Sequence, residues 1–107
     1  MQRTPIVTRH LPSDLTELLR QATPYVPPQA IELLDDLAGR AGQSVTVSDL
    51  VDRHFMSPNQ VWVYVSLLRR ALGDNRHSPR YIRTARTGRN ARAYQYIGPV
   101  AKQEVAC

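Results

Sequence analysis

Residues 59–72 constrain the fold more than any other part of this sequence, because their apolar side chains recur with the period of a helix. At about 100° per residue, four of them fall on one line of a helix surface: Val61, Val65, Leu68 and Leu72. The valines at 61, 63 and 65 also alternate as they would in a strand. However, Ser57-Pro58 is typical of a helix start and Gly73 of a helix stop. We therefore predict a helix whose apolar stripe lies in the core.

The opposite face of this predicted helix mixes short polar groups, one small apolar group and cations. Its residues are Asn59, Val63, Ser66 and Arg70, with Trp62 and Arg69 on one flank. A helix face that only meets water is usually polar throughout. The mixture indicates a surface that binds something.

The net charge of +5 is distributed unevenly along the chain. Residues 1–52 hold four Arg against seven acids, a net charge of −3, whereas residues 53–107 hold nine Arg and one Lys against two acids, a net charge of +8. The planar guanidinium of Arg suits phosphate and guanine. A GC-rich genome can explain the preference for Arg over Lys, but it does not explain the clustering. The second half of the chain is therefore expected to bind an anion.

A chain of 107 residues can form one core but not two. We predict a single, mainly helical α+β domain over residues 12–97, after a flexible arm of residues 1–11 and before a disordered tail of residues 98–107. An extra helix over residues 12–22 is expected to begin at Asp14 as N-cap. Its apolar face consists of Leu15, Leu18 and Leu19, and this face either packs on the domain or forms a dimer contact.

A second helix is expected from Pro27 or Pro28 to about Ala38, with Asp35 and Asp36 on a solvated edge. Residues 43–45 read as an extended link. Thr46 and Asp49 then form a predicted capping box for a short third helix, which a tight turn joins to the helix of residues 59–72. Helix, turn and longer helix are the order of a helix-turn-helix motif, although an ordinary helical bundle would give the same pattern.

Two segments near the C-terminus, residues 80–86 and 92–97, are rich in Tyr, Ile and Thr and flank a turn-like stretch, so they predict a β-hairpin. Arg recurs at every third position from 80 to 92, and no acid occurs among residues 75–103. Such a hairpin is expected at the surface rather than in the core. Its cations would repel one another unless an anion lay nearby.

Two of these segments resemble a known family. Residues 61–72, Val-Trp-Val-Tyr-Val-Ser-Leu-Leu-Arg-Arg-Ala-Leu, resemble the recognition helix of OmpR/PhoB-type response-regulator effector domains, whose pattern is roughly Val-Asp-Val-His-Ile-x-x-Leu-Arg-x-Lys-Leu. Residues 79–88, Pro-Arg-Tyr-Ile-Arg-Thr-Ala-Arg-Thr-Gly, resemble that family's wing. The resemblance covers about residues 27–97 and implies a winged helix-turn-helix with three to four helices and a C-terminal hairpin wing.

The chain also departs from that family. The family has a four-stranded sheet before its first helix, whereas the 26 residues here read as a helix and a Pro-rich link, and no phosphoreceiver domain is recognised. Regulation by phosphorylation is therefore not implied. Ser66 and Leu67 stand where family members often have Arg, and Thr87 replaces a Gly of the wing.

The resemblance implies a helix in the major groove of double-stranded DNA and a wing at the adjacent minor groove or backbone. Base-edge chemistry agrees, since Asn59 or Gln60 can pair bidentately with adenine and Val63 can touch a thymine methyl. The predicted contacts of the helix are Asn59, Gln60, Trp62, Val63, Ser66, Arg69 and Arg70. Those of the wing are Arg83, Arg86, Thr87, Arg89, Asn90 and Arg92. Trp62 can either stack on sugar or cover the wing.

We thus predict a sequence-specific DNA-binding transcription regulator, with a homodimer expected from the frequency of paired half-sites. Two alternatives remain at this point. One is a protein-interaction module that uses Trp62, Tyr64 and Leu67 to bind RNA polymerase or another regulator. The other is an RNA-binding protein that stacks bases on tyrosines.

Catalytic and metal chemistry is not indicated by the sequence. His10, His54, His77 and Cys107 lack the spacing of metal ligands, and no Gly-rich phosphate loop occurs. We expect no enzyme, no cofactor and no catalytic residue. The sequence has neither an 18-residue apolar run nor a secretory h-region, so a cytoplasmic protein without membrane contact is expected.

Overall fold

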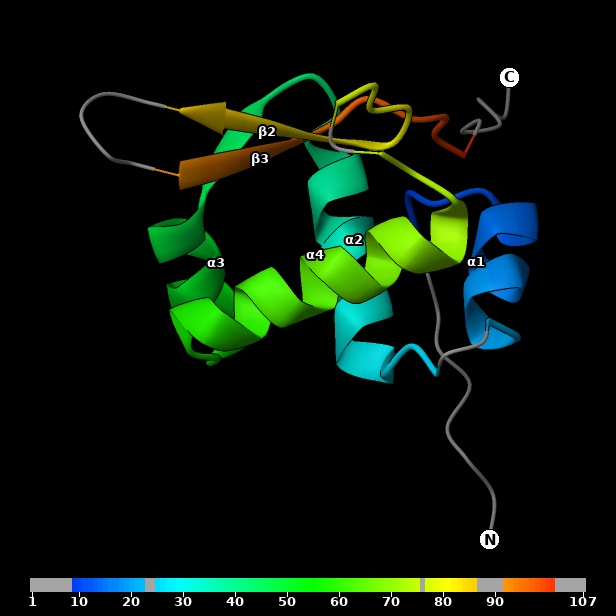
Figure 1. Ribbon diagram of the computed structural model, residues 1–107, viewed down its shortest axis with the longest axis horizontal. Coiled ribbons are helices and arrows are strands. Elements are labelled where there is room, and N and C mark those ends of the chain that lie inside the picture. The colour runs from blue at the N-terminus through cyan, green and yellow to red at the C-terminus, as the bar shows by residue number, and fades with distance from the viewer. Residues whose placement is uncertain (1–8, 23–24, 76, 87–91, 102–107) are drawn as a thin grey trace, which may run out of the picture.

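The computed structural model describes residues 9–22, 25–75, 77–86 and 92–101 (Figure 1). Within these residues it contains four helices and one three-stranded antiparallel sheet. The helices are α1 (Ser13–Arg20), α2 (Pro28–Gly39), α3 (Val47–His54) and α4 (Pro58–Leu72). The strands are β1 (Ser44–Thr46), β2 (Ile82–Arg86) and β3 (Arg92–Tyr96). The predicted α+β, mainly helical class is confirmed.

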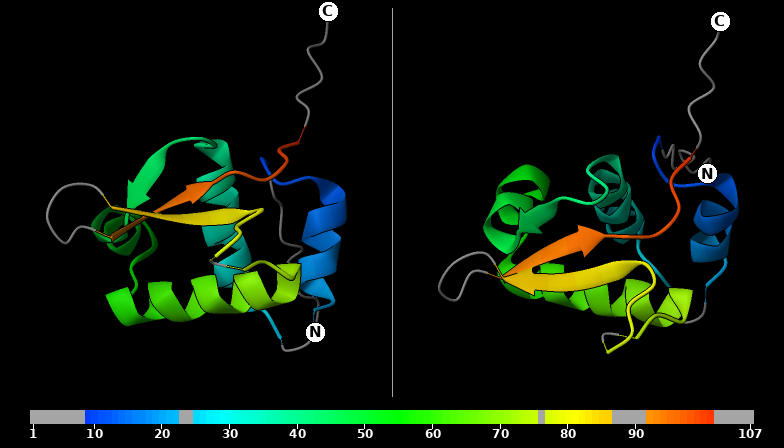
Figure 2. Two further views of the ribbon diagram at one scale, coloured as in Figure 1. Left: turned by 45° about the horizontal axis from the view of Figure 1, so that its top comes forward. Right: turned by 90° about the horizontal axis from the view of Figure 1, so that it is seen from above.

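The core lies between α2, α4 and the sheet. Helix α2 lies in the middle of the molecule (Figures 1 and 2). One side of α2 is buried throughout, at Ala30, Ile31, Leu33, Leu34 and Leu37. The stripe of α4 is buried at Val61, Val65 and Leu68, and Leu72 packs against the core from its edge. The predicted phase of α4 is therefore confirmed.

The sheet has the order β1-β3-β2, so β3 lies in the middle. The sequence suggested only an extended link at residues 43–45, and β1 becomes a strand because Val45 pairs with Tyr94 of β3 far along the chain. The expectation that the hairpin stays out of the core is wrong for its base. Ile82, Tyr94 and Tyr96 are buried there, and β3 packs against α2 and α3.

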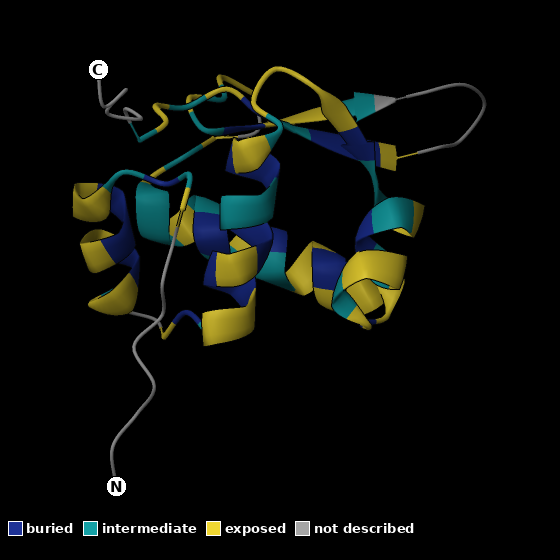
Figure 3. Cartoon of the chain, turned by 180° about the vertical axis from the view of Figure 1, so that it is seen from behind, coloured by how far each residue is buried: buried dark blue, intermediate teal, exposed yellow. Residues whose placement is uncertain are grey.

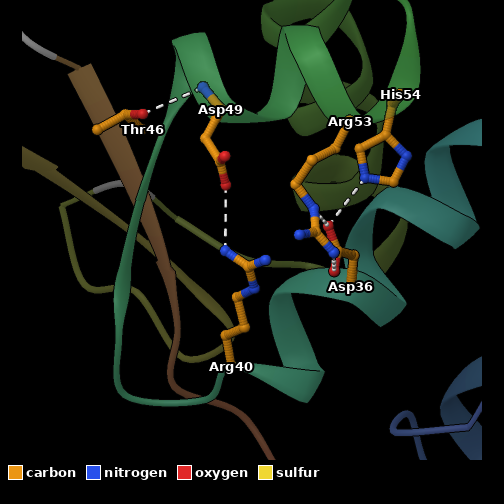
Figure 4. Close-up of polar contacts among 6 residues, drawn as sticks. All are labelled: Asp36, Arg40, Thr46, Asp49, Arg53 and His54. Carbon is orange, nitrogen blue, oxygen red and sulfur yellow. Dashed lines mark hydrogen bonds and ion pairs between the residues drawn. The ribbon is translucent and has the colours of Figure 1, made fainter.

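The α3–α4 unit has the helix-turn-helix arrangement that was predicted. The amide of Asp49 donates to the Thr46 Oγ1 at 3.1 Å, which caps α3 as expected. The carboxylate of Asp49 does not reach back to complete the box but accepts from Arg40 at 3.1 Å (Figure 4). A full capping box between Ser57 and Gln60 starts α4, and Gly73 ends it in the left-handed conformation at a φ of 68°.

The two aspartates expected on a solvated edge of α2 instead bind other parts of the fold. Asp35 accepts hydrogen bonds from the backbone amides of Arg9, His10 and Leu11 at 2.9 to 3.1 Å. The backbone carbonyl of His10 in turn accepts a hydrogen bond from the amide of Ala101 at 2.7 Å. These hydrogen bonds link residues 9–11 to α2 and to Ala101.

Asp36 links α2 to α3. Its carboxylate accepts two hydrogen bonds from Arg53, at 2.9 and 3.0 Å, and lies 3.0 Å from the His54 Nε2 (Figure 4). Burial alone would raise the pKa of Asp36, but the hydrogen bonds and charges of Arg53 and His54 outweigh it and hold this pKa below its usual value. This carboxylate therefore helps to fix the helix that precedes α4.

Helix α1 begins at Ser13, and its N-cap lies two residues before the predicted one. Its N-cap is Pro12, whose carbonyl accepts from the amide of Thr16 at 3.0 Å, and no side chain caps it. The prediction of Asp14 as N-cap is therefore wrong, and Asp14 lies within the first turn, where its charge suits the helix dipole. Leu15 and Leu19 are buried against α2 and α4, whereas Leu18 remains 47% exposed.

Candidate nucleic-acid interface

The face of α4 opposite its buried stripe is exposed to solvent. Figure 3, a view from behind, shows the same division into a buried inner side and an exposed outer side on α1. Asn59, Val63, Ser66 and Arg70, which the helical period placed together, are all exposed on this face of α4. The Ser66 hydroxyl donates to the Trp62 carbonyl at 2.9 Å, so this side chain folds back on its own helix. Gln60 is exposed but uses its carbonyl oxygen in the capping box. This face offers amide, hydroxyl, small apolar and cationic groups within one helix length.

A groove of about 350 Å³ runs beside this face. It is lined by residues 46–48 at the start of α3, by Pro58 and Trp62 of α4 and by Arg92 and Tyr94 of β3. The groove brings a predicted helix contact, Trp62, together with a predicted wing contact, Arg92. Trp62 is 54% exposed, so its ring borders the groove without filling it. No sequence signal pointed to residues 46–48, because their proximity to the wing depends on the pairing of β1 with β3.

Arg69 points toward the sheet rather than toward solvent. Its Nη2 donates to the carbonyl of Ile82 at 3.2 Å and to the Thr84 Oγ1 at 2.7 Å. Its guanidinium carbon lies 5.9 Å from the centre of the Tyr94 ring. Of the two neighbouring arginines that were predicted as contacts, only Arg70 is exposed.

The wing carries its described cations on exposed positions. Arg83 and Arg92 are exposed, and Arg92 is the backbone partner of Arg86 at the last described pair of the hairpin. Like charges on directly opposite positions of an antiparallel pair destabilise it. Thr87, Arg89 and Asn90 lie outside the described residues. Of Arg86, only the backbone is described.

The end of the hairpin at Arg86 and Arg92 lies on the same side of the molecule as α3 and the N-terminal end of α4 (Figures 1 and 2). Helix α1 lies at the other end of α4. Of the predicted helix contacts and wing contacts, Trp62 and Arg92 border the same groove. Asp74 helps to set this arrangement just after α4, since its carboxylate accepts from the amides of Arg80 at 2.7 Å and Ile82 at 3.0 Å and so directs the chain into β2.

A helix-turn-helix followed by an antiparallel hairpin, with a third strand supplied before the motif, defines the winged-helix class of DNA-binding domains. The chain matches the family model described as "Transcriptional regulatory protein, C terminal" over residues 22–88, which is more than half of its length, and it belongs to this family. This is the OmpR/PhoB-type effector family to which the recognition helix and wing were compared. A search of curated proteins gave no significant match.

Family membership shows that the chain is a DNA-binding transcription-regulator domain. The family binds double-stranded DNA and is not a family of enzymes. The matched region begins after α1, so this helix and the segment before it are additions to the family's common part. Among the described residues, none of the helices has the length and apolar character needed to cross a membrane.

Proposed function

We propose that this domain recognises a specific sequence in double-stranded DNA, with α4 in the major groove and the wing on the adjacent minor groove or backbone. The observation that supports this most is the groove beside the exposed face of α4, in which Trp62 of α4 and Arg92 of the hairpin meet. A helix of this kind fits the major groove, and a basic hairpin beside it reaches the next groove.

The side chains of this face divide into base readers and backbone contacts. Asn59 lies in the first turn of α4 and is exposed, so its amide can form the two hydrogen bonds that adenine offers in the major groove. Val63, one turn on, can contact a thymine methyl. Arg70, Arg83 and Arg92 carry charge on exposed positions and suit phosphate. Arg86, Thr87, Arg89 and Asn90 complete the proposed wing contacts.

The alternative of RNA binding, with Tyr81, Tyr94 and Tyr96 as stacking platforms, is supported less well. Tyr94 and Tyr96 are only 3% and 0% exposed, and Tyr81 is half-buried. The proposed protein-binding surface is also incomplete. Tyr64 is half-buried and donates to the Gln29 side chain at 2.9 Å, so of the three suggested residues only Trp62 is well exposed. DNA recognition uses more of the exposed groups than either alternative.

The proposal is tested with a DNA site selected from a random library and with an unrelated duplex of equal length. Trp62 is the only tryptophan and borders the groove, so its fluorescence should change when DNA binds. Failure to enrich any sequence over the random pool would contradict sequence-specific binding.

Two substitutions separate base reading from backbone binding. Asn59→Ala should cost about 1–3 kcal/mol on the selected site and leave binding to the unrelated duplex nearly unchanged. Arg92→Ala should weaken both complexes by similar factors and lower the salt slope by about one unit if it removes one phosphate contact. If Asn59→Ala, with unchanged folding, weakened both complexes equally, α4 would not be the base-reading helix.

A further inference from the structure

Arg69 occupies a place between the two elements that the proposed function uses. It extends from α4, and its Nη2 reaches β2 at the Ile82 carbonyl and the Thr84 hydroxyl. Its guanidinium also lies over the ring of Tyr94 in β3. Thr84 and Tyr94 are direct partners across the hairpin, so one side chain contacts both strands of the wing at the same level.

The contacts of Arg69 are not those expected of a side chain kept for DNA phosphate. The Nε of Arg69 is buried and has no hydrogen-bond partner among the described residues. Because it is buried, it is not accessible to DNA. Leaving such a donor unpaired is unfavourable. The shortest contact of the guanidinium, at 2.7 Å, goes to Thr84 of the wing. Through these hydrogen bonds, Arg69 ties helix α4 to the hairpin, and we call this contact between Arg69 and Thr84 the tie.

We propose that Arg69 is a positioning residue that fixes the wing relative to α4, so that both reach the DNA at once. This inference rests on the proposed function. The contact lies two residues before the last described pair of the hairpin, Arg86 with Arg92, so it holds the two strands near the described end of the wing. Binding that needs two elements in fixed register is weakened when their relative orientation is free.

The first experiment uses the free protein and does not depend on DNA. The Nε proton of Arg69 should exchange slowly with solvent in NMR spectra, because it is buried. In Thr84→Val, which keeps the side-chain shape but removes the hydroxyl acceptor, this proton and the amides of Ala85 and Ala93 should exchange at least on the order of tenfold faster. Unchanged exchange in Thr84→Val would overturn the tie.

The second experiment measures the affinity of Arg69→Lys, Arg69→Met and Thr84→Val for the selected DNA site. If planar geometry matters, Arg69→Lys should lose affinity on the order of tenfold despite its charge, about as much as Arg69→Met. The double variant of Arg69→Met and Thr84→Val should be no weaker than Arg69→Met alone, because both changes break the same contact. Arg20→Gln on α1 removes one charge elsewhere and should bind within about twofold of the parent protein.

Direct phosphate binding by Arg69 would give the opposite pattern. Arg69→Lys would then keep most of the affinity, and Thr84→Val would add to Arg69→Met as an independent change. That result overturns the positioning role while leaving the proposed function intact. If the parent protein binds no DNA, the proposed function fails, and the exchange rates of the free protein alone decide whether Arg69 ties the wing to α4.

Discussion

Leu68 is the residue on which the predicted phase of α4 can best be tested. It lies in the middle of the buried stripe and is 0% exposed. Leu68→Ala should destabilise the domain by about 2–5 kcal/mol, because it removes buried methyl groups and leaves a cavity. Urea unfolding followed by circular dichroism measures this. Ser66→Ala is the matched control on the exposed face and should stay within about 0.5 kcal/mol of the parent protein.

Tyr96 makes the domain sensitive to alkaline pH. Burial, with the nearby charges of Tyr81 and Asp14, raises the pKa of Tyr96 to about 12, and its hydroxyl donates to the carbonyl of Pro99. Because the folded pKa exceeds the ordinary value of 10.0, the stability associated with the neutral phenol is present below pH 10 and is lost as the pH rises toward 12. Unfolding curves at pH 8 and pH 11 should show this loss, and Tyr96→Phe should reduce it. Equal pH dependence in Tyr96→Phe would assign the effect to other groups.

At the scale of elements, the turn between α3 and α4 contains a residue in an unfavourable backbone conformation. Phe55 has a φ of 51° and is 95% exposed, so its side chain gains nothing from burial. Phe55→Gly should stabilise the domain by about 0.5–1 kcal/mol. Glycine adopts this conformation without the steric cost, and the entropy that glycine loses on folding offsets only part of that gain.

Phe55→Ala is the control for this turn, because alanine keeps the Cβ and hence the steric cost. Its unfolding free energy should stay close to that of the parent protein. If Phe55→Gly and Phe55→Ala changed stability equally, backbone strain would not be the cause.

The link between α2 and α3 through Asp36 should depend on pH in the acid range. The folded pKa of Asp36 lies below 3.8, so the stability from its ionised form is present above that pH and is lost as the pH falls through the lowered pKa. Asp36→Asn should cost about 1–3 kcal/mol at pH 7, because Arg53 and His54 lose a charged acceptor. The variant should also show a shallower loss of stability between pH 5 and pH 3. An unchanged acid profile would contradict the role of Asp36.

At the scale of the whole molecule, α1 extends the family's fold at the end away from the wing. Leu19 is 0% exposed and Leu18 is 47% exposed, although they are neighbours. Leu19→Asp should therefore disrupt the packing of α1 and lower stability by about 3 kcal/mol or more. Leu18→Asp should fold normally, and thermal unfolding measures both. Similar destabilisation by the two variants would mean that α1 is oriented differently.

Sedimentation of the parent protein and of Leu18→Asp tests whether this end also joins two copies. We propose a homodimer only on the ground that regulators of this class often bind paired half-sites. A parent dimer that Leu18→Asp converts to a folded monomer would place the interface on α1. A parent monomer at all concentrations would limit α1 to packing within the chain.

The sequence by itself determined the parts of the fold that depend on local periodicity and end signals. The stripe of α4, the Ser57 and Gly73 limits of that helix and the buried face of α2 follow from residues within one or two turns of each other. The exposed face of α4, with Asn59, Val63, Ser66 and Arg70, follows from the same period. These could be predicted because each depends on neighbours in the chain.

The tertiary structure alone decided which side chains meet across the chain. Sequence periodicity places Arg69 on a flank of α4 but cannot show that its side chain turns to Thr84, because it does not say which strand lies beside that flank. It also cannot show that Asp35 and Asp36 bind distant donors, or that residues 44–46 become a strand. These features depend on contacts between residues far apart in the sequence, whose geometry exists only after the helices and the sheet have packed together.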